Sequence, residues 1–179
     1  MAGDERIRLF CALQLPDDSL DAVVAWQTRV LRGEGRVVPR ENLHVTLAFL
    51  GACSVDVVEG VARELRAASA AAPPLELHPL RYRETRNVGM ILLDDPSGAA
   101  TALAEDIHER LERLGVYRPD ARRWLPHLTV LRFRKPEGLT PAVANMCSSH
   151  VVRSALYRSQ LGRDGARYEV LETAALGGS

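Results

Sequence analysis

The sequence has little lysine, few aromatic residues and no net charge. Lys135 is the only lysine among 23 basic residues, and aromatic side chains make up 5% of the 179 residues. The basic residues are balanced by 23 acidic ones. Proteins that hold long nucleic acids through their overall field are usually strongly basic, so this balance argues against that class and leaves a small or local anionic partner open. The arginine bias suits phosphate binding, but a GC-rich coding sequence explains it equally well.

Long apolar runs and paired cysteines are also missing. No stretch approaches the roughly 18 to 20 apolar residues that cross a bilayer, so we expect no membrane partner. Cys11, Cys53 and Cys147 have no CxxC spacing, and the first residues lack the apolar segment of a secretory signal. These features predict a reduced, cytoplasmic protein, with a monomer as the default. The length predicts a single domain over residues 1–179, made of two similar lobes.

Alternating and helical apolar spacing predicts an α+β chain. The helices are expected at Asp17–Leu31, at residues 54–72 and 97–114, and briefly after Thr140-Pro141. The strands are expected at Arg6–Leu15, Leu43–Leu50, Leu75–Arg83, Val88–Leu93, His127–Phe133, Val151–Leu161 and Arg167–Leu176. Each half contains a helix followed by a strand with the same signature, which favours two similar lobes over a parallel doubly wound sheet.

That signature is His-x-Thr followed by an apolar residue. It occurs as His44-Val45-Thr46-Leu47 and again as His127-Leu128-Thr129-Val130. In a strand, residues two apart project from the same face, so each strand offers an imidazole beside a hydroxyl while its apolar residues enter the core. One copy of so short a pattern is weak evidence, but two copies on predicted strands are far more specific.

Paired histidines favour acid and base catalysis near neutral pH. An unperturbed imidazole titrates near pH 6.5, so one ring can donate a proton while the other accepts one. The threonine hydroxyls beside them can donate hydrogen bonds to the non-bridging oxygens of a phosphate. This chemistry needs no metal or other cofactor, and no His, Cys and Asp set in the sequence has convincing zinc spacing.

At these motifs the chain resembles the 2H phosphoesterases, in particular their LigT-like branch, the RNA 2′,3′-cyclic phosphodiesterases also called the 2′-5′ RNA ligase family. The likeness covers nearly the whole chain. Its opening strand, both motif segments and its closing hairpin are similar to the family pattern. These segments are Arg8–Leu13, Val38–Gly51, Pro126–Arg132, Leu156–Leu161 and Gly165–Leu171.

The resemblance implies a bilobal, pseudo-symmetric fold in which two antiparallel sheets line a central cleft and helices pack outside. It also implies a reaction: water opens a terminal RNA 2′,3′-cyclic phosphate to a 2′-phosphate, with weak 2′-5′ RNA ligation as the reverse. Carried over by motif, His127 is the base that activates water and His44 is the acid that protonates the departing 3′ oxygen. Thr46 and Thr129 would hold the phosphate.

Among three further residues, Arg132 and Phe10 have two interpretations each and Phe49 has one. By the family pattern Arg132 neutralises phosphate charge, but a regular strand from His127 turns it away from the cleft unless the strand bulges or ends near Leu131. Phe10 shares a face with polar residues, so it is either a base-stacking ring or an ordinary exposed aromatic. Phe49 falls on the core face with Val45 and is expected to pack there.

Other parts of the sequence are less informative. Many relatives have a tryptophan on the strand before the third helix, whereas this chain has none in residues 86–93, which puts ligand contacts there in doubt. A cluster just before the second motif either follows a short RNA backbone or is a solvated loop. The remaining histidines lack a threonine partner, and surface roles are expected for them. These residues are Arg118, Arg122, Arg123 and Trp124 in the cluster, and the histidines His78, His108 and His150.

Two other functions remain open at this level. One is a module that binds RNA ends or a nucleotide without turnover, although a pure binder has no need of two positioned imidazoles. The other is a phosphodiesterase acting on a small cyclic phosphate such as ADP-ribose 1″,2″-cyclic phosphate.

Overall fold

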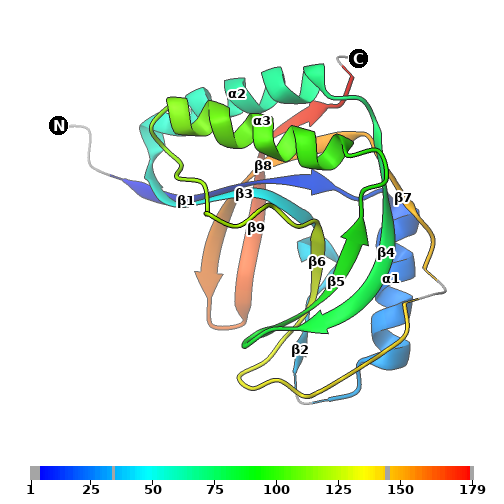
Figure 1. The fold of residues 1–179 in the computed structure, drawn as a ribbon. Coiled ribbons are helices and arrows are strands. Elements are labelled where there is room, and N and C mark those ends of the chain that lie inside the picture. The colour runs from blue at the N-terminus through cyan, green and yellow to red at the C-terminus, as the bar shows by residue number, and fades with distance from the viewer. Residues whose placement is uncertain (1–4, 34, 144–145, 178–179) are drawn as a thin grey trace.

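Two antiparallel sheets form the body of the molecule, and helices lie outside them (Figure 1). The computed structural model describes residues 5–33, 35–143 and 146–177. The strands are β1 (Arg6–Gln14), β2 (Arg36–Val37), β3 (Val45–Ser54), β4 (Leu75–Glu84), β5 (Val88–Asp94), β6 (His127–Arg132), β7 (Ser149–Val151), β8 (Arg153–Gly162) and β9 (Gly165–Ala175). The helices are α1 (Asp17–Val30), α2 (Val58–Ala71) and α3 (Ala99–Arg113), with short 3₁₀ turns η1 (Arg40–Asn42) and η2 (Val55–Val57).

The first sheet has the strand order β3-β1-β8-β9, and the second has the order β2-β6-β5-β4-β7. All pairings are antiparallel, which confirms the predicted α+β class with two antiparallel sheets and helices outside. One cluster of buried side chains includes residues from both sheets and from α2, among them Leu13, Leu65 and Leu128. Within the described residues, no helix has the length and apolar character that a membrane crossing requires.

The structure differs from the sequence prediction in short segments. Strands β2 and β7 have only 2 and 3 residues, too few to show an alternating pattern. The short helix expected after Thr140-Pro141 is wrong for the described residues of that stretch; residues 144–145 lie outside the description. There the carbonyl of Ala142 accepts a hydrogen bond of 2.8 Å from Trp26 Nε1, so this segment is fastened to α1 rather than folded into a helix.

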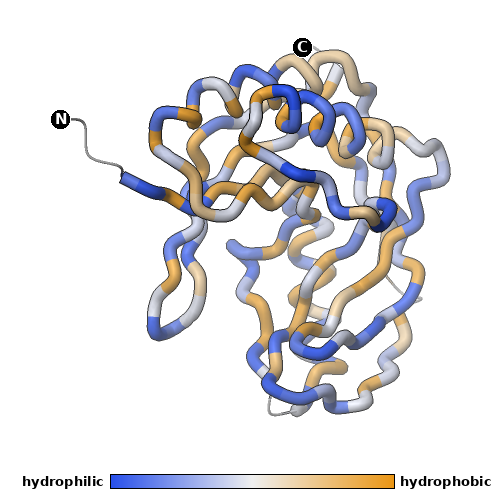
Figure 2. Tube along the Cα trace, turned by 60° about the vertical axis from the view of Figure 1, so that its left-hand side comes forward, coloured by the Kyte–Doolittle hydropathy of each residue, from blue (hydrophilic) through white to orange (hydrophobic). Residues whose placement is uncertain are grey.

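Two helices lie against the sheet that they do not follow in sequence. Helix α1 follows β1 of the first sheet but packs on the second, where the rings of Trp26 and Tyr82 are 6.1 Å apart. Helix α3 follows β5 of the second sheet but runs beside α2 over the first (Figure 1). The tube coloured by hydropathy shows hydrophobic and hydrophilic residues mixed along the helices at the top of the molecule, α2 and α3 (Figure 2). Each half of the chain therefore contributes a helix that packs on the sheet of the other half.

Each strand that bears a His-x-Thr pair contains one extra residue directly after the threonine. In the β1–β3 pair, Ala12 lies opposite Thr46 while its neighbour Cys11 lies opposite Ala48, so Leu47 has no partner. In the β5–β6 pair, Met90 lies opposite Thr129 and Gly89 lies opposite Leu131, so Val130 has none. Both irregularities are β-bulges, which turn the following side chains to the other face of the sheet.

Helix side chains take up the carbonyl groups of both extra residues. His108 Nε2 on α3 lies 2.7 Å from the carbonyl oxygen of Leu47 and donates to it. On α1, the buried amide of Gln27 donates to the carbonyls of Val38 and Val130, each at 3.0 Å. The carbonyl of Val130 also accepts a hydrogen bond of 3.0 Å from the backbone N–H of Val38. Because buried carbonyls without donors cost free energy, these bonds together stabilise the two bulges.

Replacing Gln27 with methionine, which has a similar volume and no donor, is expected to lower the free energy of unfolding by about 1–3 kcal/mol. The cause is the loss of both amide hydrogen bonds in a side chain that is 2% exposed. Urea denaturation at neutral pH measures the change. The matched control is Gln160→Met on β8, where the side chain is exposed and stability should change little. Equal effects of the two substitutions would contradict the assigned role of Gln27.

Candidate active site

The two motif histidines have the same local geometry. His44 directly precedes β3, and His127 is the first residue of β6. Nδ1 of His44 lies 2.8 Å from the carbonyl oxygen of Asn42, and Nδ1 of His127 lies 2.9 Å from that of Leu125. A carbonyl oxygen only accepts, so each Nδ1 carries the hydrogen, and each neutral ring keeps its lone pair on Nε2. Both imidazoles are thus held in the tautomer that can accept a proton at Nε2.

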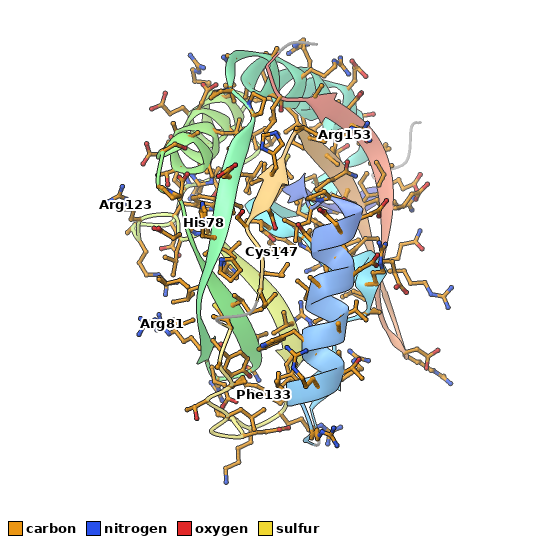
Figure 3. All side chains as sticks on the ribbon, turned by 90° about the vertical axis from the view of Figure 1, so that its right-hand side faces the viewer. His78, Arg81, Arg123, Phe133, Cys147 and Arg153 are labelled. Carbon is orange, nitrogen blue, oxygen red and sulfur yellow. The ribbon has the colours of Figure 1, made fainter. Side chains whose placement is uncertain are left out.

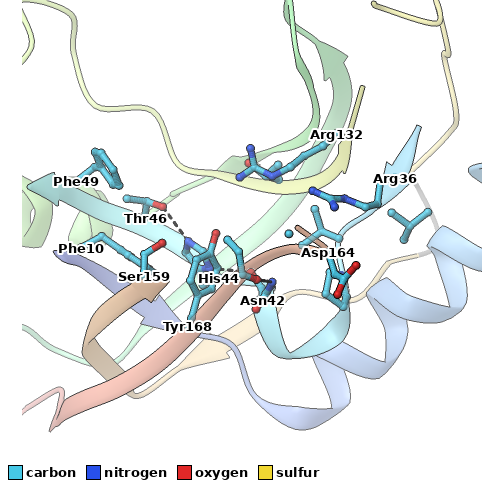
Figure 4. Close-up of a pocket in the computed structure, with 16 residues that line it drawn as sticks. Phe10, Arg36, Asn42, His44, Thr46, Phe49, Arg132, Ser159, Asp164 and Tyr168 are labelled. Atoms are coloured by element: carbon cyan, nitrogen blue, oxygen red, sulfur yellow. Dashed lines mark hydrogen bonds between the residues drawn. The ribbon is translucent and has the colours of Figure 1, made fainter. Parts of the chain in front are cut away.

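Aromatic side chains surround the ring of His44. The centroid of the Phe10 ring lies 4.8 Å from that of His44, and Tyr168 meets the imidazole edge-on at 5.4 Å. On the open side, the hydroxyl of Thr46 donates to Nε2 over 3.1 Å (Figure 4). Packing therefore fixes the plane of the imidazole, and Nε2 faces the pocket beside the hydroxyl of the threonine from the same motif.

This environment changes the acidity of His44. Burial lowers its pKa from 6.5 to about 4. The hydrogen bond to Asn42 partly opposes this effect, and the positive charge of Arg132 adds to the lowering, as would a proton on His127. At neutral pH the imidazole of His44 is therefore uncharged in the empty pocket. A bound anion, which would offset the positive charge of Arg132, would raise this pKa again.

A pocket of about 330 Å³ opens between the two sheets at these residues. It contains both threonines of the motifs, His44, and two arginines that no described ion pair neutralises, Arg36 and Arg132. The further lining residues are Phe10, Val37, Val38, Pro39, Asn42, Phe49, Ser159, Asp164, Gly165, Ala166 and Tyr168. This pocket has the size of a small-ligand site, with a mixed apolar and polar lining whose cationic and hydroxyl groups suit a phosphate.

The structure thus brings His44, Thr46, Thr129 and Arg132 around one pocket. His127 is partly exposed and does not line the pocket itself, but it lies on the opposite motif strand, close enough that a proton on its ring would lower the pKa of His44. Arg132 satisfies the condition set by the sequence: β6 bulges at Val130, and the side chain enters the cleft. The chemical roles of these residues remain predictions.

Two aromatic expectations were wrong about exposure. Phe10 is 3% exposed, and Tyr157 stacks on it with centroids 4.9 Å apart, so it supports His44 and offers no free face to a base. Phe49, expected in the core, is 52% exposed and lines the pocket. The bulge at Leu47 explains the second error, because it reverses the side-chain alternation before Phe49 is reached.

The histidines and arginines outside the motifs also differ in part from expectation. His108 does not have a surface role, since it is partly buried and bonded to β3. His150 is exposed, and the side chain of His78 is 43% exposed, as expected. Arg122 forms an ion pair of 2.9 Å with Asp120, and Trp124 donates over 3.0 Å to the carbonyl of Thr46. Arg118 and Arg123 are exposed and do not line the pocket.

Several pocket residues were missed by sequence reasoning. Arg36 comes from the two-residue strand β2 and Asn42 from η1, and Ser159 and Tyr168 come from the closing hairpin of β8 and β9. Asn42 Nδ2 donates over 2.8 Å to the carbonyl of Ala166, which joins that hairpin to the first motif. Only the family likeness of the hairpin pointed to this region. Across the described part of the chain, no three His, Cys, Asp or Glu side chains gather as a metal site would require.

Comparison with known proteins establishes the family. The family model described as the 2′-5′ RNA ligase superfamily matches residues 15–161. A protein of Escherichia coli K12 named RNA 2′,3′-cyclic phosphodiesterase is 30% identical over 173 residues, which cover 94% of this chain and 96% of that protein. The chain therefore belongs to the 2′-5′ RNA ligase superfamily.

Solved structures agree with this assignment. The crystal structure of E. coli LigT complexed with 3′-AMP matches with a TM-score of 0.81 and 28% identity, over 96% of this chain and 99% of that chain. The crystal structure of TT0787 from Thermus thermophilus matches with a TM-score of 0.83 and 27% identity, over 97% of this chain and 100% of that chain. The resemblance to the LigT-like family is confirmed, and so is the bilobal fold that it implied.

His44 is expected to titrate near pH 4 in the free protein, far below an ordinary imidazole. Since the unfolded chain binds this proton near pH 6.5, acidification from pH 6.5 towards 4 favours unfolding through this group. NMR titration of the imidazole signals measures the midpoint, and His44→Asn assigns it. Inorganic phosphate should raise the midpoint by placing negative charge beside the ring. A midpoint at or above pH 6.5 without phosphate would contradict the assigned environment.

Proposed function

We propose that this protein is a hydrolase that opens RNA 2′,3′-cyclic phosphate ends to 2′-phosphate ends without a metal. The observation that carries this proposal is the pair of imidazoles with matching carbonyl contacts, set on two sheets beside a pocket that contains two threonines and two arginines. The E. coli relative is named for this activity, and LigT has been crystallised with 3′-AMP, which supports the substrate class.

In the proposed reaction, the cyclic phosphate lies between the two imidazoles. Nε2 of His127 accepts a proton from water, and the water oxygen forms a bond to phosphorus. The bond between phosphorus and the 3′ oxygen breaks on the far side, and His44 donates its Nε2 proton to that oxygen. Thr46, Thr129 and Arg132 hold the non-bridging oxygens. The products are a 2′-phosphate and a free 3′ hydroxyl, and weak 2′-5′ ligation is the same path in reverse.

The lowered pKa of His44 is consistent with its role as the proton donor only when substrate is bound. An imidazole with a pKa of about 4 is neutral at pH 7 and cannot act as an acid. The negative charge of the cyclic phosphate stabilises the imidazolium form and offsets the charge of Arg132. Substrate binding and protonation of His44 are therefore coupled, so His44 becomes an acid in the complex.

Phe49 is the proposed contact for the terminal base. Its ring is half-exposed at the pocket, and the guanidinium of Arg8 lies 5.3 Å from its centroid, which supports the ring from one side. Stacking of a base on an aromatic ring contributes about 1–3 kcal/mol and tolerates different bases. Phe49 thus takes the base-stacking role that was one of the two interpretations of Phe10.

We further propose that the enzyme acts in the cytoplasm as a monomer. All three cysteines, Cys11, Cys53 and Cys147, are free thiols, which suits a reducing compartment. One chain supplies both motifs, so the proposed chemistry requires no second copy.

His44→Ala and His127→Ala are each expected to lower kcat on an oligoribonucleotide with a 2′,3′-cyclic phosphate by about 10²–10⁴-fold. Each variant loses one proton-transfer group. A second substrate, with sulfur in place of the bridging 3′ oxygen, separates the roles because a thiolate leaves without being protonated. On it His44→Ala should regain most of its activity and His127→Ala should not. Initial rates with EDTA present measure both effects.

His78→Ala and His150→Ala serve as controls, since both side chains lie outside the pocket and should leave the rates unchanged. Full activity of either motif variant would overturn the proposal. Rescue of His127→Ala by the sulfur substrate would reverse the assignment of acid and base. Inhibition by EDTA would contradict a metal-independent reaction. Tight RNA binding without product would identify a binding module, and faster opening of ADP-ribose 1″,2″-cyclic phosphate would identify a small substrate.

A further inference from the structure

A second cavity adjoins the catalytic pocket and has a strongly basic lining. Its volume is about 960 Å³. We call it the basic groove; it is lined by Arg32, Gly33, Arg36, Arg132, Phe133, Arg134, Lys135, Pro136, Glu137 and Leu139. The loops that form it lie at the lower end of the molecule, where β6 ends and α1 leads to β2 (Figure 1). This end also shows a high proportion of hydrophilic residues (Figure 2).

The charge of the groove is unbalanced among its described lining. Five side chains are cationic and exposed, whereas Glu137 is the only acidic residue that lines it. Among the described residues, none of the five cations forms an ion pair with a carboxylate. Exposed cations gathered along a groove attract a polyanion, even though the net charge of the whole chain is zero.

The groove has a fixed wall. After β6, the backbone N–H of Phe133 donates over 3.0 Å to the carbonyl of Asn87. Further along the loop, the carboxylate of Glu84 accepts from the N–H groups of Gly138 at 2.8 Å and Leu139 at 3.0 Å. These bonds anchor both ends of the loop that carries Arg134 and Lys135. The loop that carries these cations is therefore held in place against the rest of the structure.

The groove is continuous with the catalytic pocket. Arg36 and Arg132 line both cavities. In the close-up view, these two arginines lie on one side of His44, and Phe49 lies on the other (Figure 4). A ligand that occupies the pocket can therefore extend past Arg132 into the groove.

The structure of ribose gives this arrangement a direction. A 2′,3′-cyclic phosphate spans C2′ and C3′, the base is attached at C1′ beside C2′, and the 5′ chain leaves from C4′ beside C3′. Base and 5′ chain therefore depart on opposite sides of the cyclic phosphate. With the base on Phe49, the 5′ chain points towards Arg36 and Arg132 and the groove beyond them.

We propose that the basic groove binds the phosphate backbone of the nucleotides that precede the cyclic end, with Arg134 and Lys135 as its principal cations. This inference rests on the proposed function, because it takes the cyclic phosphate to lie at the histidines. The groove makes single-stranded RNA chains better substrates than a cyclic mononucleotide. It selects through the backbone and not through the bases.

The test compares kcat and KM for a nucleoside 2′,3′-cyclic phosphate and for an oligoribonucleotide with the same terminal nucleotide. The variant R134Q/K135Q removes two groove cations that do not line the catalytic pocket. Its control, R118Q/R123Q, removes two exposed arginines of the loop before the second motif, and Arg123 lies well away from Phe133 (Figure 3). Both variants change the net charge equally.

R134Q/K135Q is expected to raise KM for the oligoribonucleotide about three- to thirtyfold and to leave kcat, and both constants for the mononucleotide, unchanged. The slope of log(kcat/KM) against log[salt] for the oligoribonucleotide should become shallower by about 1.4, which corresponds to two lost contacts with a single strand. The control should match the wild type on both substrates.

Equal KM values of the variant and the wild type for the oligoribonucleotide would overturn the inference, as would an effect confined to R118Q/R123Q. A loss of equal size on both substrates would also overturn it, because the residues would then act on the catalytic pocket. Failure of the wild type to open either substrate would instead refute the proposed function. The two failures are therefore distinguishable.

Discussion

In each motif strand, one extra residue after the threonine reverses the alternation of side chains, and the composition of the pocket depends on that reversal. Without the bulge at Leu47, Phe49 would point into the core; without the bulge at Val130, Arg132 would turn away from the cleft. In both strands the bulge directs a later side chain into the pocket, but the two side chains differ in chemistry. One strand supplies an aromatic ring and the other supplies a cation.

These bulges persist because their carbonyl groups have donors from distant parts of the chain. His108 on α3 serves Leu47, and Gln27 on α1 serves Val130. A third bond joins the halves directly, since the indole of Trp124, just ahead of His127, donates to the carbonyl of Thr46. The spacing of the two imidazoles therefore depends on bonds that cross between the lobes. Catalytic geometry and the packing of the helices are parts of the same network.

The sequence predicts the main strands and helices because apolar period two and helical spacing are local signals. It also predicts which face of each motif strand carries His and Thr. It places Phe49 wrongly because the bulge depends on His108, which lies far along the chain on α3. Phe10 is misplaced for a similar reason: Tyr157 and Tyr168, which bury it, arrive from the closing hairpin. The sequence does not predict the basic groove as a unit, because Arg132, Arg134 and Lys135 form a local cluster of cations but Arg32 and Arg36 join it from a distant part of the chain.

If two imidazoles open the cyclic phosphate by expelling its 3′ oxygen, the product end carries a defined phosphate. Phosphorus NMR of that end, with an oligoribonucleotide 2′,3′-cyclic phosphate as substrate and water labelled with ¹⁸O, is the decisive measurement. We expect a 2′-phosphate as the sole product, with one ¹⁸O atom on phosphorus. A 3′-phosphate product would contradict the assigned geometry, and an unchanged cyclic phosphate would contradict the proposed activity itself.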